Sequence, residues 1–397
     1  MKKSLLNLCG SAIAAGCLFL LSSGQAAPGS WSQKKEIPML VSGLPAGCAV
    51  DGLFYVIGGA ESSNRTYAAL QTVFAYNPQT DSWQRKRDMP TPRRFLTAVA
   101  VDNTIYVIGG SVGPPLGVAT NLVEAYDPTT DTWSQKKAMP TPRACPTACA
   151  LNGIIYVLGG AQSSSQPLTA VEAYDPQTDS WTTKARLPMA TTFPASGAVN
   201  GRIYAFMGTS TFEYNPLLDS WRAKATHEPW CFGQSCATVG DTIYLFGGMP
   251  PNMVGSYDFS LSYDPAQDRF SARRRMPRPR VLSPCAAIDG RIYIAAGVSM
   301  EPLVNPGAEF YVFNDVFDPS GGISPLILEL NRTSPSSFHL AWQAEQGIRY
   351  GIETNSQPTG QWRPTAVNVL ADTNLAEAIC PVNDTNPQCF FRVFETK

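Results

Sequence analysis

The sequence predicts an all-β protein: a six-bladed β-propeller closed by an N-terminal strand, followed by a small C-terminal β-sandwich. Three observations predict this fold. An apolar run ending in glycine recurs about every 50 residues, an aromatic turn motif follows each copy, and the period stops after Gly322. The composition agrees with it, because 32 Gly, 33 Pro and only 15% charged residues suit many short strands joined by tight turns.

The glycine motif occurs six times. Its second glycine stands at positions 59, 110, 160, 208, 248 and 297, so successive repeats lie 51, 50, 48, 40 and 49 residues apart. Four copies keep both glycines, whereas the fourth reads Phe-Met-Gly and the sixth Ala-Ala-Gly. A period near 50 is typical of propeller blades and not of helical solenoids. In a blade the glycine pair would end the second strand, where a side chain would crowd the neighbouring blade.

An aromatic turn follows each glycine motif. It reads YNPQTDSW from Tyr76, YDPTTDTW from Tyr126, YDPQTDSW from Tyr174, YNPLLDSW from Tyr214, YDPAQDRF from Tyr263 and FDPSGG from Phe317. Asx-Pro starts a turn, and the Tyr and Trp would fill the space between blades. A glycine pair followed by Tyr and then Trp resembles the Kelch repeat, over about residues 31–322. The resemblance implies four-stranded blades, with the loops on the glycine side as the common ligand-binding face.

The sixth repeat lacks the Trp strand that the other repeats carry. The N-terminal segment WSQKKEIP, from Trp31, matches WSQKKAMP, from Trp133, almost residue for residue. We therefore expect the N-terminal strand to complete the sixth blade. This arrangement would tie the two ends of the ring together and cover an exposed strand edge.

The first residues have the pattern of a bacterial signal peptide. Lys2 and Lys3 precede an apolar run that ends at Leu21, and Gly24-Gln25-Ala26 offers a cleavage site. We predict a signal peptide over residues 1–26, the propeller over 27–322 and the sandwich over 323–397. The protein would be secreted or periplasmic, with no stable membrane insertion after cleavage. Loss of the two lysines lowers the formal net charge from −1 to −3, which gives no indication of a nucleic-acid partner.

The C-terminal segment shows strand alternation in LILEL, SFHLAW, IRYGIET and CFFRVFE. This pattern resembles a fibronectin type III β-sandwich. Cys380 and Cys389 flank the turn-rich stretch PVNDTNPQ, and we predict a disulfide between them.

Pro-Arg pairs recur in the loops that lead into the predicted innermost strands. Counting back 17 residues from the second glycine position gives Ser42, Arg93, Arg143, Thr191, Cys231 and Arg280. These loops lie on the glycine side, so we expect the three arginines to face one rim and to suit a carboxylate or another anionic group. Arg94 and Trp230 are neighbouring candidates. The equally open alternative is that each Arg belongs to the loop consensus and binds backbone carbonyls.

Six cysteines lie on or beside the predicted innermost strands, which converge on the central channel of a propeller. We place Cys48, Cys145, Cys149, Cys236 and Cys285 on innermost strands, with Cys231 opening one. Small buried thiols would pack well where six strands converge. Disulfides between adjacent blades are the alternative.

We expect no catalytic residue, metal or cofactor. The copper site of Kelch-type oxidases uses two histidines and two tyrosines. The chain holds two histidines, but His339 lies in the appended C-terminal segment, so the propeller retains only His227, which is too few for that site. A zinc site of His227, Cys231 and Cys236 would have unusual spacing.

Three functional hypotheses remain. The first is an exported, non-enzymatic binding module that recognises a protein or a glycan, anionic ones included, through one propeller face. The second is a periplasmic sugar mutarotase or epimerase similar to sialic-acid mutarotases, which would need paired carboxylates on that face. The third is a structural surface protein.

Overall fold

The computed structural model describes residues 29–39, 45–61, 68–113, 118–163, 166–252, 255–299, 309–310 and 313–319, and six strands between residues 327 and 395. The chain divides into two compact units, and Trp31–Pro319 forms one of them. The described residues form strands and turns without a helix, so none of them belongs to a helix that could cross a membrane. The predicted signal peptide, residues 1–26, lies outside the described residues.

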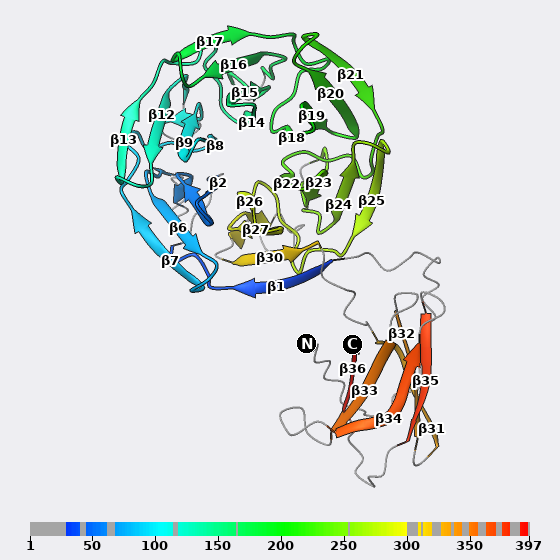
Figure 1. Ribbon diagram of the computed structural model, residues 1–397. Coiled ribbons are helices and arrows are strands. Elements are labelled where there is room, and N and C mark those ends of the chain that lie inside the picture. Colours follow the sequence, from blue (N-terminus) through cyan, green and yellow to red (C-terminus); the bar gives the residue numbers. More distant parts are fainter. Residues whose placement is uncertain are drawn as a thin grey trace. The chain divides into compact units, whose positions relative to one another are not determined.

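Six four-stranded sheets stand in a ring around one axis (Figure 1). The first blade contains β2 (Ala46–Val50), β3 (Leu53–Ile57), β6 (Val73–Asn77) and β7 (Ser82–Lys86), from the innermost strand outward. The second contains β8 (Thr97–Val101), β9 (Thr104–Ile108), β12 (Val123–Asp127) and β13 (Thr132–Gln135). The third contains β14 (Thr147–Leu151), β15 (Ile154–Leu158), β16 (Val171–Asp175) and β17 (Ser180–Thr183).

The other three blades follow the same order. The fourth contains β18 (Ala195–Val199), β19 (Arg202–Met207), β20 (Ser210–Asn215) and β21 (Ser220–Lys224). The fifth contains β22 (Ser235–Val239), β23 (Thr242–Phe246), β24 (Ser260–Asp264) and β25 (Arg269–Arg273). The sixth contains β26 (Cys285–Ile288), β27 (Arg291–Ala295), β30 (Asn314–Asp318) and β1 (Ser30–Lys34). The predicted six-bladed, all-β propeller is confirmed.

In the sixth sheet the first strand of the chain lies beside β30. The Trp31 indole Nε1–H donates to the Arg274 carbonyl at 2.9 Å. Its ring centroid lies 5.5 Å from that of Phe246 and 5.0 Å from that of Phe317. Closure of the ring by this strand stays a prediction, and a Trp31 variant can test it.

The core of the propeller lies between blades. Strand β3 is buried on both faces, so its side chains alternate between two neighbouring clusters. Tyr55 and Ile57 pack with residues of the second blade such as Val107. Phe54 and Val56 pack with residues of the sixth blade. Each blade therefore gains its stability from its neighbours.

Adjacent blades are also joined at their outer edge by a polar contact that we call the outer clasp. The Trp83 indole donates to the Lys35 carbonyl at 2.8 Å, and the Lys35 N–H donates to Asp81 Oδ1 at 2.8 Å. The Tyr76 hydroxyl donates to the same Asp81 oxygen at 2.6 Å. Three further seams repeat both bonds, at Arg87, Lys137 and Ala185. The Tyr and Trp of the turn motif thus hold blades together, as predicted, and the Asp five residues after the Tyr contributes as well.

The two glycines of a pair keep side chains away from two different inter-blade loops. Gly110 has φ +97°, and a Cβ there would lie 2.8 Å from the Arg94 carbonyl oxygen, in the loop that enters its own blade. At Gly109 the Cβ would lie 2.7 Å from the Arg143 carbonyl oxygen in the following blade. Crowding of the neighbouring blade, the predicted reason for the motif, is confirmed.

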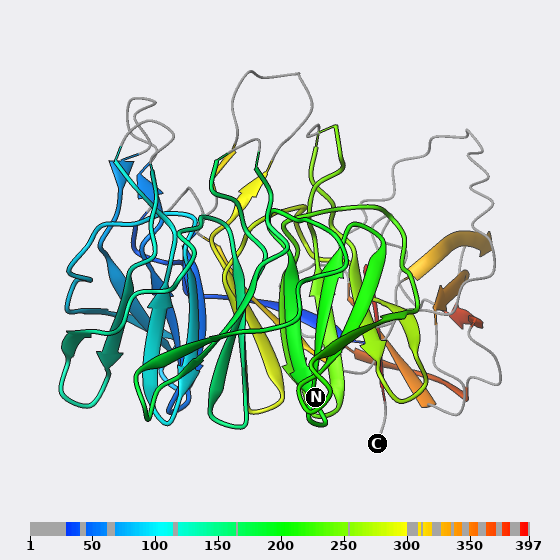
Figure 2. The same ribbon diagram turned by 90° about the horizontal axis from the view of Figure 1, so that it is seen from above.

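Short hairpins follow the glycine motif in three blades. They are β4 (Ala60–Glu61) with β5 (Ala68–Ala69), β10 (Ser111–Val112) with β11 (Val118–Ala119), and β28 (Val298–Ser299) with β29 (Glu309–Phe310). Figure 2 shows them on one side of the ring, at the top of the view. The propeller therefore has two different faces.

The C-terminal segment contains two three-stranded sheets. One has the order β31 (Ile327–Ser334), β32 (Ser337–Gln343) and β35 (Leu375–Pro381), and the other β34 (Arg363–Leu370), β33 (Arg349–Asn355) and β36 (Phe390–Glu395). Four of the six strands overlap the predicted segments, whereas β34 and β35 were not predicted. The fibronectin-like sandwich stays a prediction. The Cys380–Cys389 disulfide stays one too, because Cys389 lies outside the described residues.

Candidate functional site

Inter-blade loops lead from each outer strand into the next innermost strand, and a ring of backbone hydrogen bonds joins them. We call it the mouth ring; its members are Phe95, Cys145, Phe193, Gly233 and Leu282. From Cys145 onward, the N–H of each member donates to the carbonyl of the preceding member, at 2.7, 3.2, 3.3 and 2.8 Å in turn. All five residues have φ between 57° and 69°, a left-handed conformation that non-glycine residues adopt at a cost. The ring therefore holds the loops of five blades in one register.

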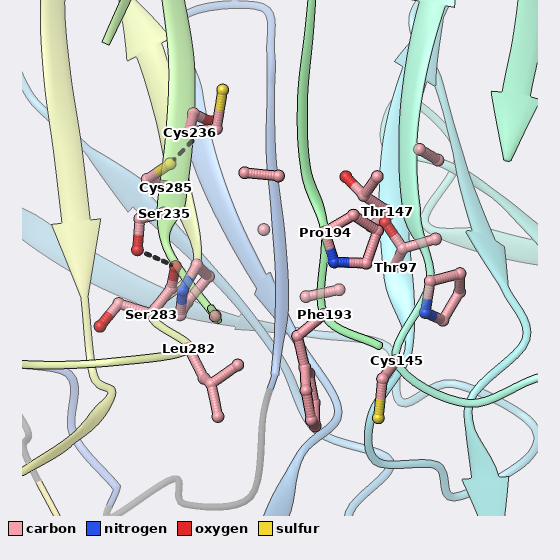
Figure 3. A pocket seen from close by; sticks show the side chains of 18 of the residues that line it. Thr97, Cys145, Thr147, Phe193, Pro194, Ser235, Cys236, Leu282, Ser283 and Cys285 are labelled. Carbon is pink, nitrogen blue, oxygen red and sulfur yellow. Dashed lines mark hydrogen bonds between the residues drawn. The ribbon is translucent and has the colours of Figure 1, made fainter. Parts of the chain in front are cut away.

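The mouth ring surrounds a pocket of about 770 Å³, solvent at its opening included (Figure 3). All six blades line it, through residues 45–47, 95–98, 145–148, 193–196, 233–236 and 282–285. None of these lining residues carries a charged side chain. The polar groups are hydroxyls, such as Thr147 and Ser196 at 2.9 Å from each other, and the Gln234 amide. Gln234 is 9% exposed, and its Nε2 has no hydrogen-bond partner among the described residues.

Aromatic side chains form a row beside this pocket, which we call the aromatic row: Phe95, Phe193, Phe232 and Trp230. The Phe95 and Phe193 ring centroids are 6.3 Å apart, and Phe193 and Phe232 stack at 6.1 Å. Trp230 meets Phe232 edge-on at 5.8 Å and is 40% exposed. A side chain at Gly208 would collide with the Trp230 indole. Of the five predicted ligand-binding residues, Trp230 is the one that presents a large exposed surface.

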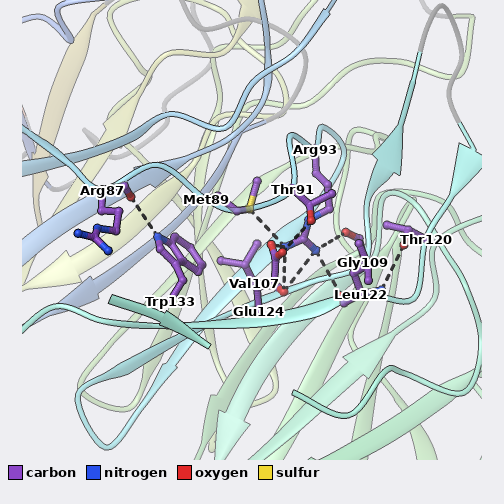
Figure 4. A network of polar contacts seen from close by, with 10 residues as sticks. All are labelled: Arg87, Met89, Thr91, Arg93, Val107, Gly109, Thr120, Leu122, Glu124 and Trp133. Atoms are coloured by element: carbon purple, nitrogen blue, oxygen red, sulfur yellow. Dashed lines mark hydrogen bonds and ion pairs between the residues drawn. The ribbon is translucent and has the colours of Figure 1, made fainter. Parts of the chain in front are cut away.

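The predicted arginines do not face the rim. Arg93 is fully buried, and its Nη1 donates to the Gly109 carbonyl at 2.9 Å (Figure 4). Its Nη2 donates to Glu124 Oε2 at 2.7 Å, and Thr91 Oγ1 donates to the other carboxylate oxygen at 2.8 Å. Burial lowers the pKa of Arg93, and the Glu124 carboxylate opposes that shift.

Arg143 and Arg280 repeat this arrangement. Arg143 Nη1 donates to the Gly159 carbonyl at 3.0 Å and to the Ala170 carbonyl at 2.9 Å, and Nη2 bonds Glu172. Arg280 pairs with Asp315, and both arginines are at most 1% exposed. Arg93 and Arg143 thus bind backbone carbonyls, which is the alternative that the sequence left open. Ligand contact through Arg93, Arg143 and Arg280 stays a prediction, and their burial argues against it.

Arg94 is also buried, at 2% exposed. Its Nη2 donates to the Gly113 carbonyl at 3.3 Å, and its guanidinium carbon lies 5.4 Å from the Phe95 ring centroid. Burial lowers the pKa of Arg94. Arg94 therefore packs against Phe95 of the aromatic row, and its direct contact with a ligand stays a prediction.

The acidic partners of the arginines were missed, although the sequence contains their signal. The residue two positions before the motif's first aromatic is Glu124, Glu172 or Asp315 in the three repeats with Arg. In the three repeats that have Ser42, Thr191 or Cys231 instead, it is Phe74, Phe212 or Leu261. Arg and acid occur together or not at all. That co-occurrence indicates an ion pair inside each of these three blades and not a shared binding surface.

The cysteine prediction needs one correction. Cys145 is not on an innermost strand: it precedes β14 in an inter-blade loop, where its φ of 57° and its bond to Phe95 make it part of the mouth ring. The thiols of Cys48, Cys145, Cys149, Cys231, Cys236 and Cys285 are all free, so none of the six is in a disulfide. Burial raises the pKa of the Cys48 and Cys149 thiols to about 12. These two pack as small apolar groups.

Metal ligands do not gather in the described part of the chain. No group of three or more His, Cys, Asp or Glu side chains there could hold a metal ion. His227, Cys231 and Cys236, the set weighed for zinc, are thus not brought together as ligands.

These features identify the protein as a propeller built from sequence repeats. Its blades are four-stranded, its glycine pairs pack against inter-blade loops, and those loops line a pocket. Comparison with known families agrees: the Kelch motif matches residues 44–90, and the FKB95, Kelch-repeats domain matches residues 90–247. The propeller therefore consists of Kelch repeats over at least residues 44–247.

Curated relatives match shorter stretches. Kelch-like ECH-associated protein 1B of Danio rerio is 32% identical over 85 residues, which is 21% of this chain and 14% of that protein. Kelch-like protein terF of Aspergillus terreus is 35% identical over 85 residues, 21% of this chain and 18% of that protein. Kelch-like protein 35 of Mus musculus is 35% identical over 82 residues, 20% of this chain and 13% of that protein. The chain thus matches less than a fifth of the length of each.

Proposed function

We propose that this chain is an exported, non-enzymatic binding module that recognises a protein partner through the propeller face bearing the pocket and the aromatic row. The observation that carries the proposal is the uncharged pocket bordered by partly exposed aromatic rings. Aromatic side chains are enriched in protein interfaces and dominate their energetics. The name of the Danio rerio relative, an ECH-associated protein, supports partner binding as a use of Kelch repeats.

The chemistry of the pocket favours a neutral contact over an anionic one. The arginines that would have attracted a carboxylate are buried and paired with acids of their own blades. The lining offers instead hydroxyls and the unpaired Gln234 amide, which can donate to a carbonyl of the partner. We infer that an uncharged side chain or loop of the partner enters the mouth of the pocket.

Export rests on the pattern of residues 1–26. We propose cleavage after Ala26 and a secreted or periplasmic location. N-terminal sequencing of the protein recovered from the exported fraction tests both points. Recovery of the uncleaved chain with the cell contents would contradict them.

The mutarotase alternative receives no support from the comparisons or from the pocket. General acid–base exchange of anomers needs a carboxylate or a comparable group, and the described lining of the pocket contains no Asp, Glu or His. Anomer exchange of sialic acid, followed by NMR, remains the direct test. Acceleration over buffer would restore this alternative.

Partner capture tests the proposed face. Tagged wild-type protein is compared with Trp230→Ala and Phe193→Ala, using the exported fraction as the source of partner. Loss of a central aromatic contact weakens binding by about 2 kcal/mol, which is roughly 30-fold. Leu217→Ala is the matched control, because Leu217 is 88% exposed on the turn between β20 and β21, at the other end of its blade.

The outcomes separate the two faces. Weak capture by both aromatic variants, with normal capture by Leu217→Ala, supports the proposal. Normal capture by Trp230→Ala and Phe193→Ala would place the interface elsewhere. If the capture recovered a glycan and no protein, the proposed class of partner would be wrong, whereas the proposed binding face would stand. Thermal unfolding of each variant controls for loss of the fold.

A further inference from the structure

We propose that Cys236 and Cys285 are a redox pair that forms a reversible disulfide between the fifth and sixth blades, in the wall of the pocket. The proposal concerns the chemistry of the two thiols and does not depend on the partner proposed above. Nothing in the comparisons assigns a modification to either residue.

The two cysteines occupy the same place in adjacent blades. Cys236 lies opposite Leu245 in the pairing of β22 with β23, and Cys285 lies opposite Ile294 in the pairing of β26 with β27. The Cys285 Sγ donates to the backbone carbonyl of Cys236 at 2.9 Å. Figure 3 shows the Cys285 sulfur pointing to Cys236, whose own sulfur points away. The disulfide therefore requires the Cys236 side chain to rotate about its Cα–Cβ bond, so that its sulfur turns to Cys285.

Both cysteines line the pocket, which opens to solvent, and each residue is partly exposed. A small reagent that enters the pocket would therefore reach this part of its wall. The contrast with Cys48, Cys149 and Cys231, which are buried, is clear. The nearby Cys285 raises the pKa of Cys236 further after burial has raised it, with a smaller contribution from Cys149. Cys285 is therefore the first partner for Cys236, and Cys149 is the competitor that an experiment has to exclude.

The reaction is thiol–disulfide exchange with a small disulfide such as oxidised glutathione. One cysteine loses a proton and attacks the disulfide, which forms a mixed disulfide and releases one glutathione. The second cysteine loses a proton and attacks the protein sulfur of that mixed disulfide, which releases the second glutathione. The protein gives up two electrons and two protons, and oxidised glutathione takes up the electrons. Oxidising compartments, where exported proteins reside, favour the disulfide form.

Burial sets the rate of this exchange. The pKa of Cys285 is raised to about 12 by burial, and that of Cys236 well above its usual value. The thiolate, which is the nucleophile, is therefore scarce at neutral pH. Oxidation should be slow near pH 7 and become about tenfold faster for each unit of rising pH below these pKa values.

A consequence for the pocket follows from the position of the pair. The crosslink would tie two neighbouring innermost strands together and draw two sulfur atoms out of the lining. It would also close a long covalent loop, which raises stability mainly by restricting the unfolded chain. Reduction would reverse both effects, so the pair would report the redox state of the surroundings at the binding face.

The test uses the folded mature chain incubated with oxidised glutathione at about pH 8.5, where thiolate formation is faster. Peptide mapping without reductant should yield one linked peptide, Cys236 to Cys285, which dithiothreitol removes. Cys48→Ser is the matched control and should give the same linkage. Cys236→Ser and Cys285→Ser should give no linkage and a glutathione adduct on the remaining cysteine of the pair.

Two results would overturn the proposal. One is a wild-type map that contains only glutathione adducts at Cys236 and Cys285. The other is linkage of Cys236 to Cys149. Both are read on the wild-type chain, so neither depends on the folding of a variant. As a second readout, oxidation should raise the thermal midpoint of the wild type by several degrees, whereas an unchanged midpoint together with a linked peptide would contradict a joined native pair.

Discussion

We expect His227 to make the folded propeller less stable in acid, and its replacement by methionine should remove this contribution. It occupies a buried position where the other blades use Ile37, Met89, Met139, Leu187 and Met276. The backbone is the same, since the His227 N–H donates to the Thr209 carbonyl at 3.0 Å as the Met139 N–H donates to the Asn121 carbonyl at 2.9 Å. His227→Met therefore introduces the residue that three equivalent positions, Met89, Met139 and Met276, already have.

The imidazole is poorly placed to become charged. It is 4% exposed and lies 5.0 Å from the Phe270 ring centroid, and neither ring nitrogen has a hydrogen-bond partner among the described residues. Burial lowers the pKa of His227 from 6.5 to about 4. Each unit of difference from the ordinary pKa corresponds to about 1.4 kcal/mol, so the whole effect is about 3 kcal/mol.

The sign follows from which state binds the proton first. Because the folded-state pKa is the lower one, the unfolded chain takes up the proton as the pH falls below 6.5, whereas the folded chain does not until about pH 4. The free energy of unfolding therefore decreases as the pH falls from 6.5 to about 4. Below about pH 4 it has decreased by the full amount of about 3 kcal/mol. Above about pH 7 the imidazole is neutral in both states, and the contribution vanishes.

Urea unfolding at pH 7.5 and pH 4.5 measures the effect. Relative to the wild type, His227→Met should gain about 2 to 3 kcal/mol at pH 4.5 over its difference at pH 7.5. Carboxylates that titrate in the same range affect both proteins equally and cancel. Leu187→Met, at the equivalent position of another seam, is the control and should show no such gain. An equal difference at both pH values would refute the reasoning, because His227 would then not titrate between them.

Three further substitutions test other contacts, each by urea unfolding. Arg143→Ala should cost about 3 to 5 kcal/mol, because it leaves Glu172 buried without a partner. Combining Arg143→Met with Glu172→Leu should recover most of that loss, and failure to recover would contradict a purely structural pair. Trp31→Ala should cost about 3 kcal/mol if the N-terminal strand closes the ring, and nothing if it does not. Gly153→Ala should cost about 1 kcal/mol, because this glycine has a positive φ. Gly110→Ala should cost clearly more, because Gly110 has a positive φ and a crowded Cβ as well. Equal losses would remove crowding as the reason for the motif.

Repetition made most of the propeller predictable from the sequence. Each blade meets nearly the same surroundings, so a residue such as Gly110 or Trp133 recurs wherever the same contact recurs. Six noisy copies of a motif indicate one structural role more firmly than a single copy could. In the C-terminal segment no repeat supports the pattern, and β34 and β35 went unpredicted although four neighbouring strands were found.

The candidate site was less predictable, because its residues break the repeat pattern. The mouth ring has Phe95, Cys145, Phe193, Gly233 and Leu282 at one equivalent position, with no shared chemistry. Their backbone conformation repeats while their side chains vary. The recurring arginines predicted a binding surface when taken as a set, yet their recurrence indicates a structural role. Arg93 bonds Glu124, which lies 31 residues further along the chain. The spacing between successive repeats gives no information about such a contact between two residues of the same repeat.

The outer clasp leaves the surface of the ring open to change. It uses the backbone N–H and C=O of the residue it holds, so the side chain at that position takes no part. The chain already contains Lys35, Arg87 and Lys137 in three such positions and Ala185 in a fourth, with the same two bonds. The charge of the outer wall can therefore be altered, or a label attached there, without loosening a seam between blades.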